Sequence, residues 1–102
     1  MFDEYELYID PPKSNKGGAG ILIRKGIFEH IEISNEKIEM NCNCTGCLTE
    51  SIFLNVHSKD FTLTVGCCYR HPNGNTSHFN DSLSNCLQKF DKKGFFLYLV
   101  GI

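Results

Sequence analysis

The residues best suited to chemistry in this 102-residue chain lie where one apolar stretch ends. Residues 64–68 are β-branched or small and fit a buried strand, and the chain continues with Tyr69 and Arg70, a polar aromatic and a cation. The Pro-Asn-Gly sequence at 72–74 ends the strand, because proline cannot donate to a sheet and Asn-Gly favours a tight turn. Side chains at such a strand-to-loop junction often carry function, so we expect a candidate site here.

Cysteine spacing offers a second kind of chemistry, the binding of a metal. Cys42, Cys44 and Cys47 are spaced like metal ligands among polar turn residues. A zinc site needs a fourth ligand, and His57 is the only nearby candidate in the sequence. We therefore expect an inert surface loop, ahead of a zinc site and of a redox or disulfide role. A small Cys-dependent metal- or partner-binding module remains an alternative.

The other three cysteines suit a hydrophobic core. Cys67 and Cys68 are neighbours in one predicted strand, so their side chains should point to opposite faces of the sheet. Cys86 falls on the apolar face of a predicted helix.

Periodicity predicts several strands, which either alternate apolar and polar residues or are apolar throughout. The expected strands are residues 5–9, 21–23, 27–33, 51–57, 61–69 and 95–100. The fourth and fifth of these should form a hairpin across residues 58–60.

One helix is expected between the hairpin and the last strand. A single apolar stripe runs from Phe79 to Phe90 at helical spacing. Thr76 or Ser77 can cap the start, and Asp81 would favour the positive end of the helix dipole. A hairpin, a helix and a strand in this order predict a mixed sheet with the helix on one face.

Composition limits the classes of function. The net charge of −2 gives no overall basic character for binding nucleic acid. The acidic residues 1–4 are unlike a signal peptide, and the longest apolar run is too short to span a bilayer. We expect one intracellular domain with no membrane partner and no small-molecule cofactor. The one local basic group is expected to be a solvated face, and its members are Lys13, Lys16, Arg24 and Lys25.

Four segments in order along the chain resemble motifs of one family. Residues 64–73 resemble the V-G-x-x-Y-R-P-P-N signature of the endonuclease domain of non-LTR retrotransposons, within the endonuclease/exonuclease/phosphatase superfamily. Residues 16–25 resemble its K-G-G-G-V-A-I-L-I-K strand, and residues 50–56 its E-x-I-F-I-E-I strand. Residues 75–90 resemble its F-x-x-x-L-x-x-x-L helix, and residues 95–101 resemble the hhhhGDFN strand that follows, where h is an apolar residue. The resemblance implies an α/β (mixed α+β) fold, a partial four-layer α/β sandwich with a mostly antiparallel sheet and one clear helix.

The same resemblance implies a function and a set of site residues. The intact element would nick target DNA with Mg²⁺ to prime reverse transcription, and it would need access to the nucleus. Tyr69 matches the tyrosine that hydrogen-bonds the scissile phosphate, and Asn73 matches the asparagine that helps to hold it. Phenol and amide donors can stabilise charge on phosphate oxygens, and Arg70 could add a bidentate phosphate contact.

The chain departs from the family pattern where that pattern supplies metal ligands. Gly101 is followed by Ile102 in place of Asp-Phe-Asn, and neither the upstream glutamate motif nor the C-terminal Asp-His pair has a match. His71 replaces a proline of the signature and is expected to be a surface histidine. We expect an internal fragment that lacks both catalytic flanks and is inactive alone, or, alternatively, a relative acting on another phosphoester. Four acids are expected in turns or on the helix surface, without matching a family ligand: Glu50, Asp60, Asp81 and Asp91.

Overall fold

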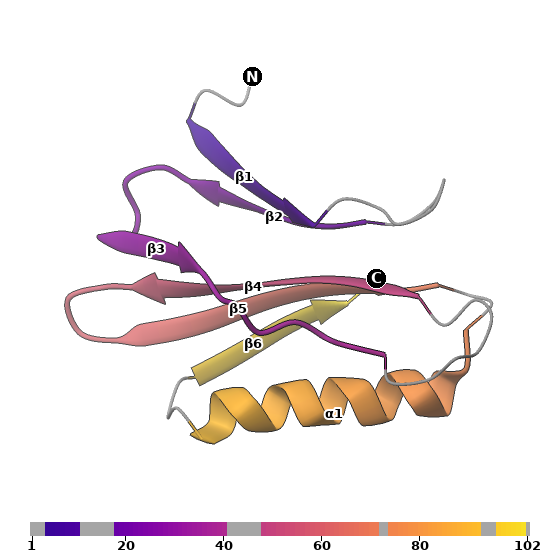
Figure 1. Ribbon diagram of the computed structural model, residues 1–102. Helices are drawn as coiled ribbons and strands as arrows, with labels where there is room; N and C mark the ends of the chain where they lie inside the picture. The colour runs from indigo at the N-terminus through magenta and orange to yellow at the C-terminus, as the bar shows by residue number, and fades with distance from the viewer. Residues whose placement is uncertain (1–3, 11–17, 41–47, 72–73, 93–95, 102) are drawn as a thin grey trace.

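The computed structural model describes residues 4–10, 18–40, 48–71, 74–92 and 96–101, with side chains described as far as residue 90. Six strands and one helix occupy this part of the chain (Figure 1). They are β1 (Tyr5–Asp10), β2 (Ala19–Arg24), β3 (His30–Ile33), β4 (Thr49–His57), β5 (Thr62–Arg70), α1 (Thr76–Lys92) and β6 (Phe96–Gly101).

The elements form three layers (Figure 1). A two-stranded antiparallel sheet, β1-β2, lies on one side of a four-stranded sheet of order β3-β4-β5-β6, and α1 covers the other side. Within the larger sheet β3, β4 and β5 are antiparallel, and β6 runs parallel to β5. The helix supplies the crossover that a parallel pair requires. This arrangement confirms the mixed α+β class, and its layers are those of a partial α/β sandwich.

The β4–β5 hairpin forms the centre of the molecule. Each strand is nine residues long, and the turn closes with a hydrogen bond from the Ser58 amide to the Phe61 carbonyl oxygen (2.9 Å). Because layers cover both faces of the sheet, β4 is buried over almost its whole length. A strand buried on both faces reads as a continuous apolar run, and residues 52–54 have that character.

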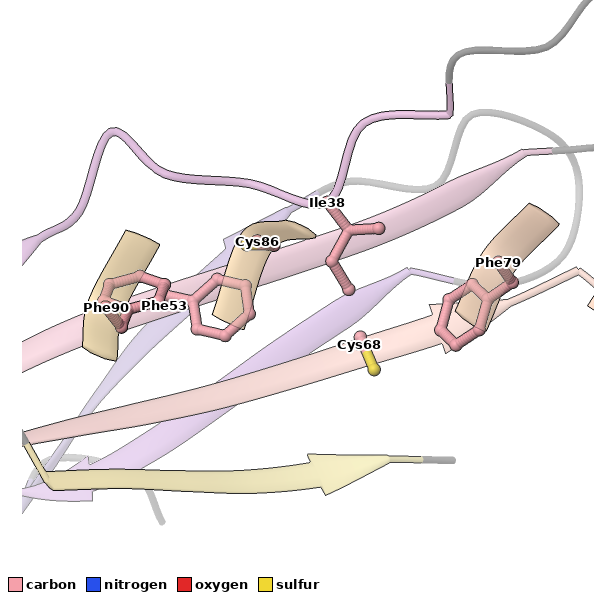
Figure 2. Close-up of a cluster of buried hydrophobic side chains, with 6 residues drawn as sticks. All are labelled: Ile38, Phe53, Cys68, Phe79, Cys86 and Phe90. Atoms are coloured by element: carbon pink, nitrogen blue, oxygen red, sulfur yellow. The ribbon is translucent and has the colours of Figure 1, made fainter. Parts of the chain in front are cut away.

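One cluster of buried side chains joins α1 to the large sheet (Figure 2). Its centre is the pair Phe53 and Phe90, whose ring centroids lie 4.9 Å apart. The helical stripe predicted from the sequence supplies half of the cluster and is therefore confirmed. The buried members are Ile38, Phe53, Cys68, Phe79, Cys86 and Phe90, with Met40, Leu83 and Leu87 packed against them.

A second cluster fills the space between the two sheets. Alternate residues of β4, namely Ile52, Leu54 and Val56, point into it and meet Ala19 at the start of β2. Cys67 belongs to this cluster, whereas Cys68 belongs to the helix-side cluster. The prediction that the two cysteines serve opposite faces is confirmed.

The start of α1 differs from the sequence prediction. The cap is Asn75, whose Oδ1 accepts a hydrogen bond from the His78 amide at 3.0 Å, and the helix begins at Thr76. Asparagine at this position satisfies an amide that has no partner within the helix. Asp81 lies beyond the first turn, which holds no acid, so its expected role at the helix start was wrong.

The observed strand β3 is shorter than the strand that the alternating pattern predicts over residues 27–33. Regular pairing begins only at His30, whose partner His57 is the last residue of β4. The Glu29 amide makes a final bond to the His57 carbonyl oxygen (3.0 Å), and beyond it β4 offers no partner. Ile27 is therefore 60% exposed, next to Gly26, which has a φ of 86°.

No helix in the part of the chain that the structure describes is long and apolar enough to cross a membrane.

Candidate functional site

The site predicted from the sequence lies at one edge of the large sheet, where β4 begins and β5 ends. Tyr69 stands opposite Glu50 in the β4–β5 register. Tyr69 shares its strand face with Cys67, so its half-buried side chain lies on the side that faces β1-β2. Glu50 shares the same face with Ile52. The strand register therefore places a phenol and a carboxylate side by side.

Glu50 and His71 form a buried pair, which corrects two expectations. His71 is 8% exposed and Glu50 is fully buried, so neither is a surface or turn residue. The His71 Nε2 lies 2.8 Å from Glu50 Oε2 and 3.1 Å from Oε1. At these distances an N–H on Nε2 can donate to both carboxylate oxygens. A histidine in place of the signature's proline can reach back to the strand beside it, which proline cannot.

His71 also contacts Tyr69 directly. The two rings meet edge to face, with centroids 5.1 Å apart and an angle of 85° between their planes. The backbone is fixed on both sides of this contact. Thr49 Oγ1 donates to the Tyr69 carbonyl oxygen (2.8 Å), and the His71 amide bonds the Leu48 carbonyl oxygen (3.3 Å). The strand exit therefore holds Tyr69, His71 and Glu50 as one connected group.

Arg70 does not join this group. As the neighbour of Tyr69 in a strand it faces the opposite side, the side of Cys68 and α1. Asn73, the other residue that the resemblance assigned to the phosphate, lies outside the described residues. Of the three predicted site residues, the structure places Tyr69 beside groups that could act with it.

A second buried acid lies at the same end of the molecule. Asp10 ends β1 and is 9% exposed. Its Oδ2 accepts a hydrogen bond from the Ser51 amide at 2.8 Å, and Lys37 Nζ lies 3.3 Å from its Oδ1. Asp10 therefore connects the small sheet to the beginning of β4, at the residue next to Glu50. The sequence pattern predicted a first strand that ends at residue 9 and indicated no role for Asp10.

The alternation of residues along β4 could have predicted the burial of Glu50. Alternate residues of a strand share a face, and Glu50 falls in the same series as Ile52, Leu54 and Val56. A predicted strand extended by one residue would therefore have placed its carboxylate on a buried face. His71 has the parity of Tyr69 and Cys67 in the same way. No comparable signal in the sequence pairs Glu50 with His71, because their contact depends on the hairpin register.

Most of the other predicted groups that the structure describes are exposed side chains. Asp60 and Asp81 are exposed, as expected, and Asp91 is in the last turn of α1. Arg24 and Lys25 are exposed too, and Arg24 lies 3.8 Å from the Glu4 carboxylate. Two members of the basic group and all three residues of the proposed cysteine site lie outside the described residues: Lys13, Lys16, Cys42, Cys44 and Cys47.

His57, considered as a fourth zinc ligand, is engaged elsewhere. Its Nε2 lies 3.2 Å from Glu32 Oε1 and its Nδ1 lies 3.1 Å from Thr62 Oγ1. Its ring stacks on His30 at 5.4 Å. The hydrogen bond from His57 lowers the pKa of the Glu32 carboxyl. These contacts tie β3 to β4 at the opposite end of the strands from Tyr69.

Comparisons with protein-family models, curated proteins and solved structures each returned no match.

Proposed function

We propose that this chain contributes a phosphodiester-contacting surface of a DNA endonuclease of the retrotransposon type, in which the intact enzyme nicks target DNA to prime reverse transcription. The proposal rests on the four ordered motif resemblances. The single structural observation that supports it best is the place of Tyr69, half-buried at the exit of a central strand and beside two ionisable side chains. Strand ends that feed loops are common places for functional groups.

The chemistry proposed for Tyr69 is hydrogen-bond donation from its hydroxyl to a non-bridging phosphate oxygen. Arg70 leaves the strand on the other face, so we assign it to a neighbouring phosphate along the DNA backbone and not to the phosphate held by Tyr69. Guanidinium groups suit such contacts because they donate two parallel hydrogen bonds. Asn73 stays in the proposal on the strength of the resemblance alone.

Mg²⁺ is the metal that the resemblance implies, and the described residues do not fit it. Magnesium takes oxygen ligands in a near-octahedral set. The Glu50 carboxylate is hydrogen-bonded to His71. The Asp10 carboxylate accepts a hydrogen bond from the Ser51 amide and forms an ion pair with Lys37. Among the described residues there is no group of three or more His, Cys, Asp or Glu that could hold a metal ion. The activity proposed for this chain is therefore phosphodiester binding.

DNA binding by fluorescence anisotropy tests the proposal, with a fluorescein-labelled DNA duplex at low salt as the probe. Tyr69→Phe removes one hydroxyl and should weaken binding about tenfold, the effect of losing one hydrogen bond to a charged group. Arg70→Ala should weaken binding and reduce its salt dependence.

The matched control is Tyr5→Phe, which removes the same hydroxyl from an exposed residue of β1. Its dissociation constant should equal that of the unchanged chain. Equal affinities for the Tyr69→Phe and Tyr5→Phe proteins would refute the phosphate role of Tyr69.

A further inference from the structure

The buried pair Glu50–His71 is not explained by folding alone. On the face of β4 that is turned toward β1-β2, the neighbours of Glu50 are apolar, and they include Ile52 and Leu54. A buried carboxylate and imidazole lose their hydration, and well-packed apolar side chains of similar size are often at least as stabilising. Ionisable groups that are buried beside a functional side chain are candidates for a role in that function.

We propose that Glu50 and His71 are positioning residues, which hold the ring of Tyr69 in the one orientation that suits a phosphate contact. This inference rests on the proposed phosphate role of Tyr69. Both oxygens of Glu50 lie within hydrogen-bonding distance of a single nitrogen of His71, at 2.8 Å and 3.1 Å. The imidazole held in this way packs edge to face against the Tyr69 ring.

The geometry suits this task because Glu50 fixes His71, and His71 in turn contacts the ring of Tyr69. A hydrogen on Nε2 lies between the two Glu50 oxygens, which fix the direction of this N–H, and the contact with Tyr69 limits rotation of the ring about it. Backbone bonds to Leu48 and from Gly74 hold the His71 main chain. A hydroxyl that is held in place before substrate arrives loses less freedom on binding, which raises affinity. Tyr69 would then bind phosphate without first ordering its own side chain.

Fluorine NMR of the protein labelled with 3-fluorotyrosine tests the positioning directly, without any ligand. The chain has four tyrosines, and Tyr69→Phe identifies the resonance of Tyr69. His71→Gln keeps a donor for Glu50 but removes the ring that touches Tyr69. We expect this variant to stay folded and to broaden or split the Tyr69 resonance, as a ring that samples several orientations does, while the other resonances keep their line width. A change of position alone would follow from loss of the imidazole ring current and is not the readout. Glu50→Met, which releases the imidazole, should broaden or split the same resonance.

A purely structural pair would behave differently. A Tyr69 resonance that stays single and equally narrow in folded His71→Gln and Glu50→Met proteins would overturn the proposal. Should the single variants fail to fold, Glu50→Met combined with His71→Leu replaces the pair by apolar residues of similar size. That double variant is expected to fold and to give a broadened or split Tyr69 resonance, and a single narrow resonance in it would likewise overturn the proposal.

DNA binding distinguishes this inference from the proposed function. His71→Gln should weaken binding of the fluorescein-labelled duplex about three- to tenfold, and should add little in a protein that already carries Tyr69→Phe. Additive losses in the double variant would contradict positioning through Tyr69. If Tyr69→Phe leaves affinity unchanged, the phosphate role fails, while the NMR result still decides whether Glu50 and His71 hold the ring.

Discussion

The Asp10 carboxylate accepts a hydrogen bond from the Ser51 amide at 2.8 Å, across 41 positions of sequence. The bond joins the last residue of β1 to an early residue of β4, so it connects the two sheets at the edge where Tyr69 lies. An amide in a buried strand needs an acceptor, and here a side chain supplies it.

Asp10→Ala should therefore destabilise the protein. It leaves the buried Ser51 amide without this acceptor, and we expect the free energy of unfolding to fall by about 1–3 kcal/mol. Urea denaturation followed by circular dichroism measures the change. Asp60→Ala, at an exposed position in the hairpin turn, is the control and should change stability by less than about 0.5 kcal/mol. Equal effects of the two substitutions would show that the sheet-to-sheet bond has no stabilising role.

Phe90→Ala tests the helix-side core. The Phe90 side chain is fully buried and its ring packs on Phe53. Removing it should lower the free energy of unfolding by about 3–5 kcal/mol, through lost burial and the cavity left behind. If that variant does not fold, Phe90→Leu, with a smaller expected loss, gives the measurement in urea. Phe61→Ala is the control, since Phe61 is 46% exposed, and a loss as large as that at Phe90 would contradict the packing described.

Asn75→Ala tests the helix cap. The substitution removes the acceptor for the His78 amide, and a loss of about 1 kcal/mol in the free energy of unfolding is expected. Asn85→Ala provides a matched control, because Asn85 is an exposed asparagine inside the same helix. Alanine there should be neutral or slightly stabilising, given its higher helix propensity. The idea of an Asn75 cap would fail if both variants lost the same stability.

The free energy of unfolding should fall above pH 9, and ionisation of the buried Cys86 thiol should contribute to this loss. Burial raises the pKa of its thiol from 9.0 to about 11. A raised pKa in the folded state means that the neutral thiol is favoured there, so its contribution is complete below pH 9 and is lost as the pH rises toward 11. Urea titrations across this range should show a decline to which Cys86 contributes about 1–2 kcal/mol.

The comparison protein is Cys86→Ala, which lacks the titrating thiol. It should be less stable at neutral pH because of the space left in the core, yet its stability should decline less between pH 9 and pH 11. Parallel curves for the two proteins would exclude Cys86 as a source of the alkaline loss.

A nicking assay on supercoiled plasmid tests the metal chemistry. Because the two buried carboxylates near Tyr69 are both engaged by protein donors, we expect the chain to leave the plasmid intact with Mg²⁺. Chelation of the metal should change nothing. Nicked product that requires Mg²⁺ and disappears in Tyr69→Phe would overturn this expectation.

Local patterns predicted most of the fold. The β4–β5 hairpin and the apolar stripe of α1 follow from spacing within short segments, and both are present. The prediction that the third strand begins at residue 27 was wrong, because the start of this strand depends on its partner and not on its own sequence pattern. Alternation indicates which side chains share a face, but a strand also needs a partner, and β4 ends at His57.

The candidate site was only partly predictable. Tyr69 was recognised from its place after a buried run, whereas the burial of Glu50 and His71 was missed. Their contact arises because β4 and β5 pair in one register that brings position 50 opposite position 69. Register depends on the turn and on both cores together, so it is a property of the assembled hairpin.

Cys67 and Cys68 are adjacent in sequence, yet each is sealed beneath a different layer of the protein. The chain therefore carries two native reporters of how it opens. A thiol reagent that reaches Cys67 first would indicate that the small sheet has lifted away, whereas earlier reaction at Cys68 would indicate that α1 has detached. Mass spectrometry of single-cysteine variants during partial unfolding would order these two events in time.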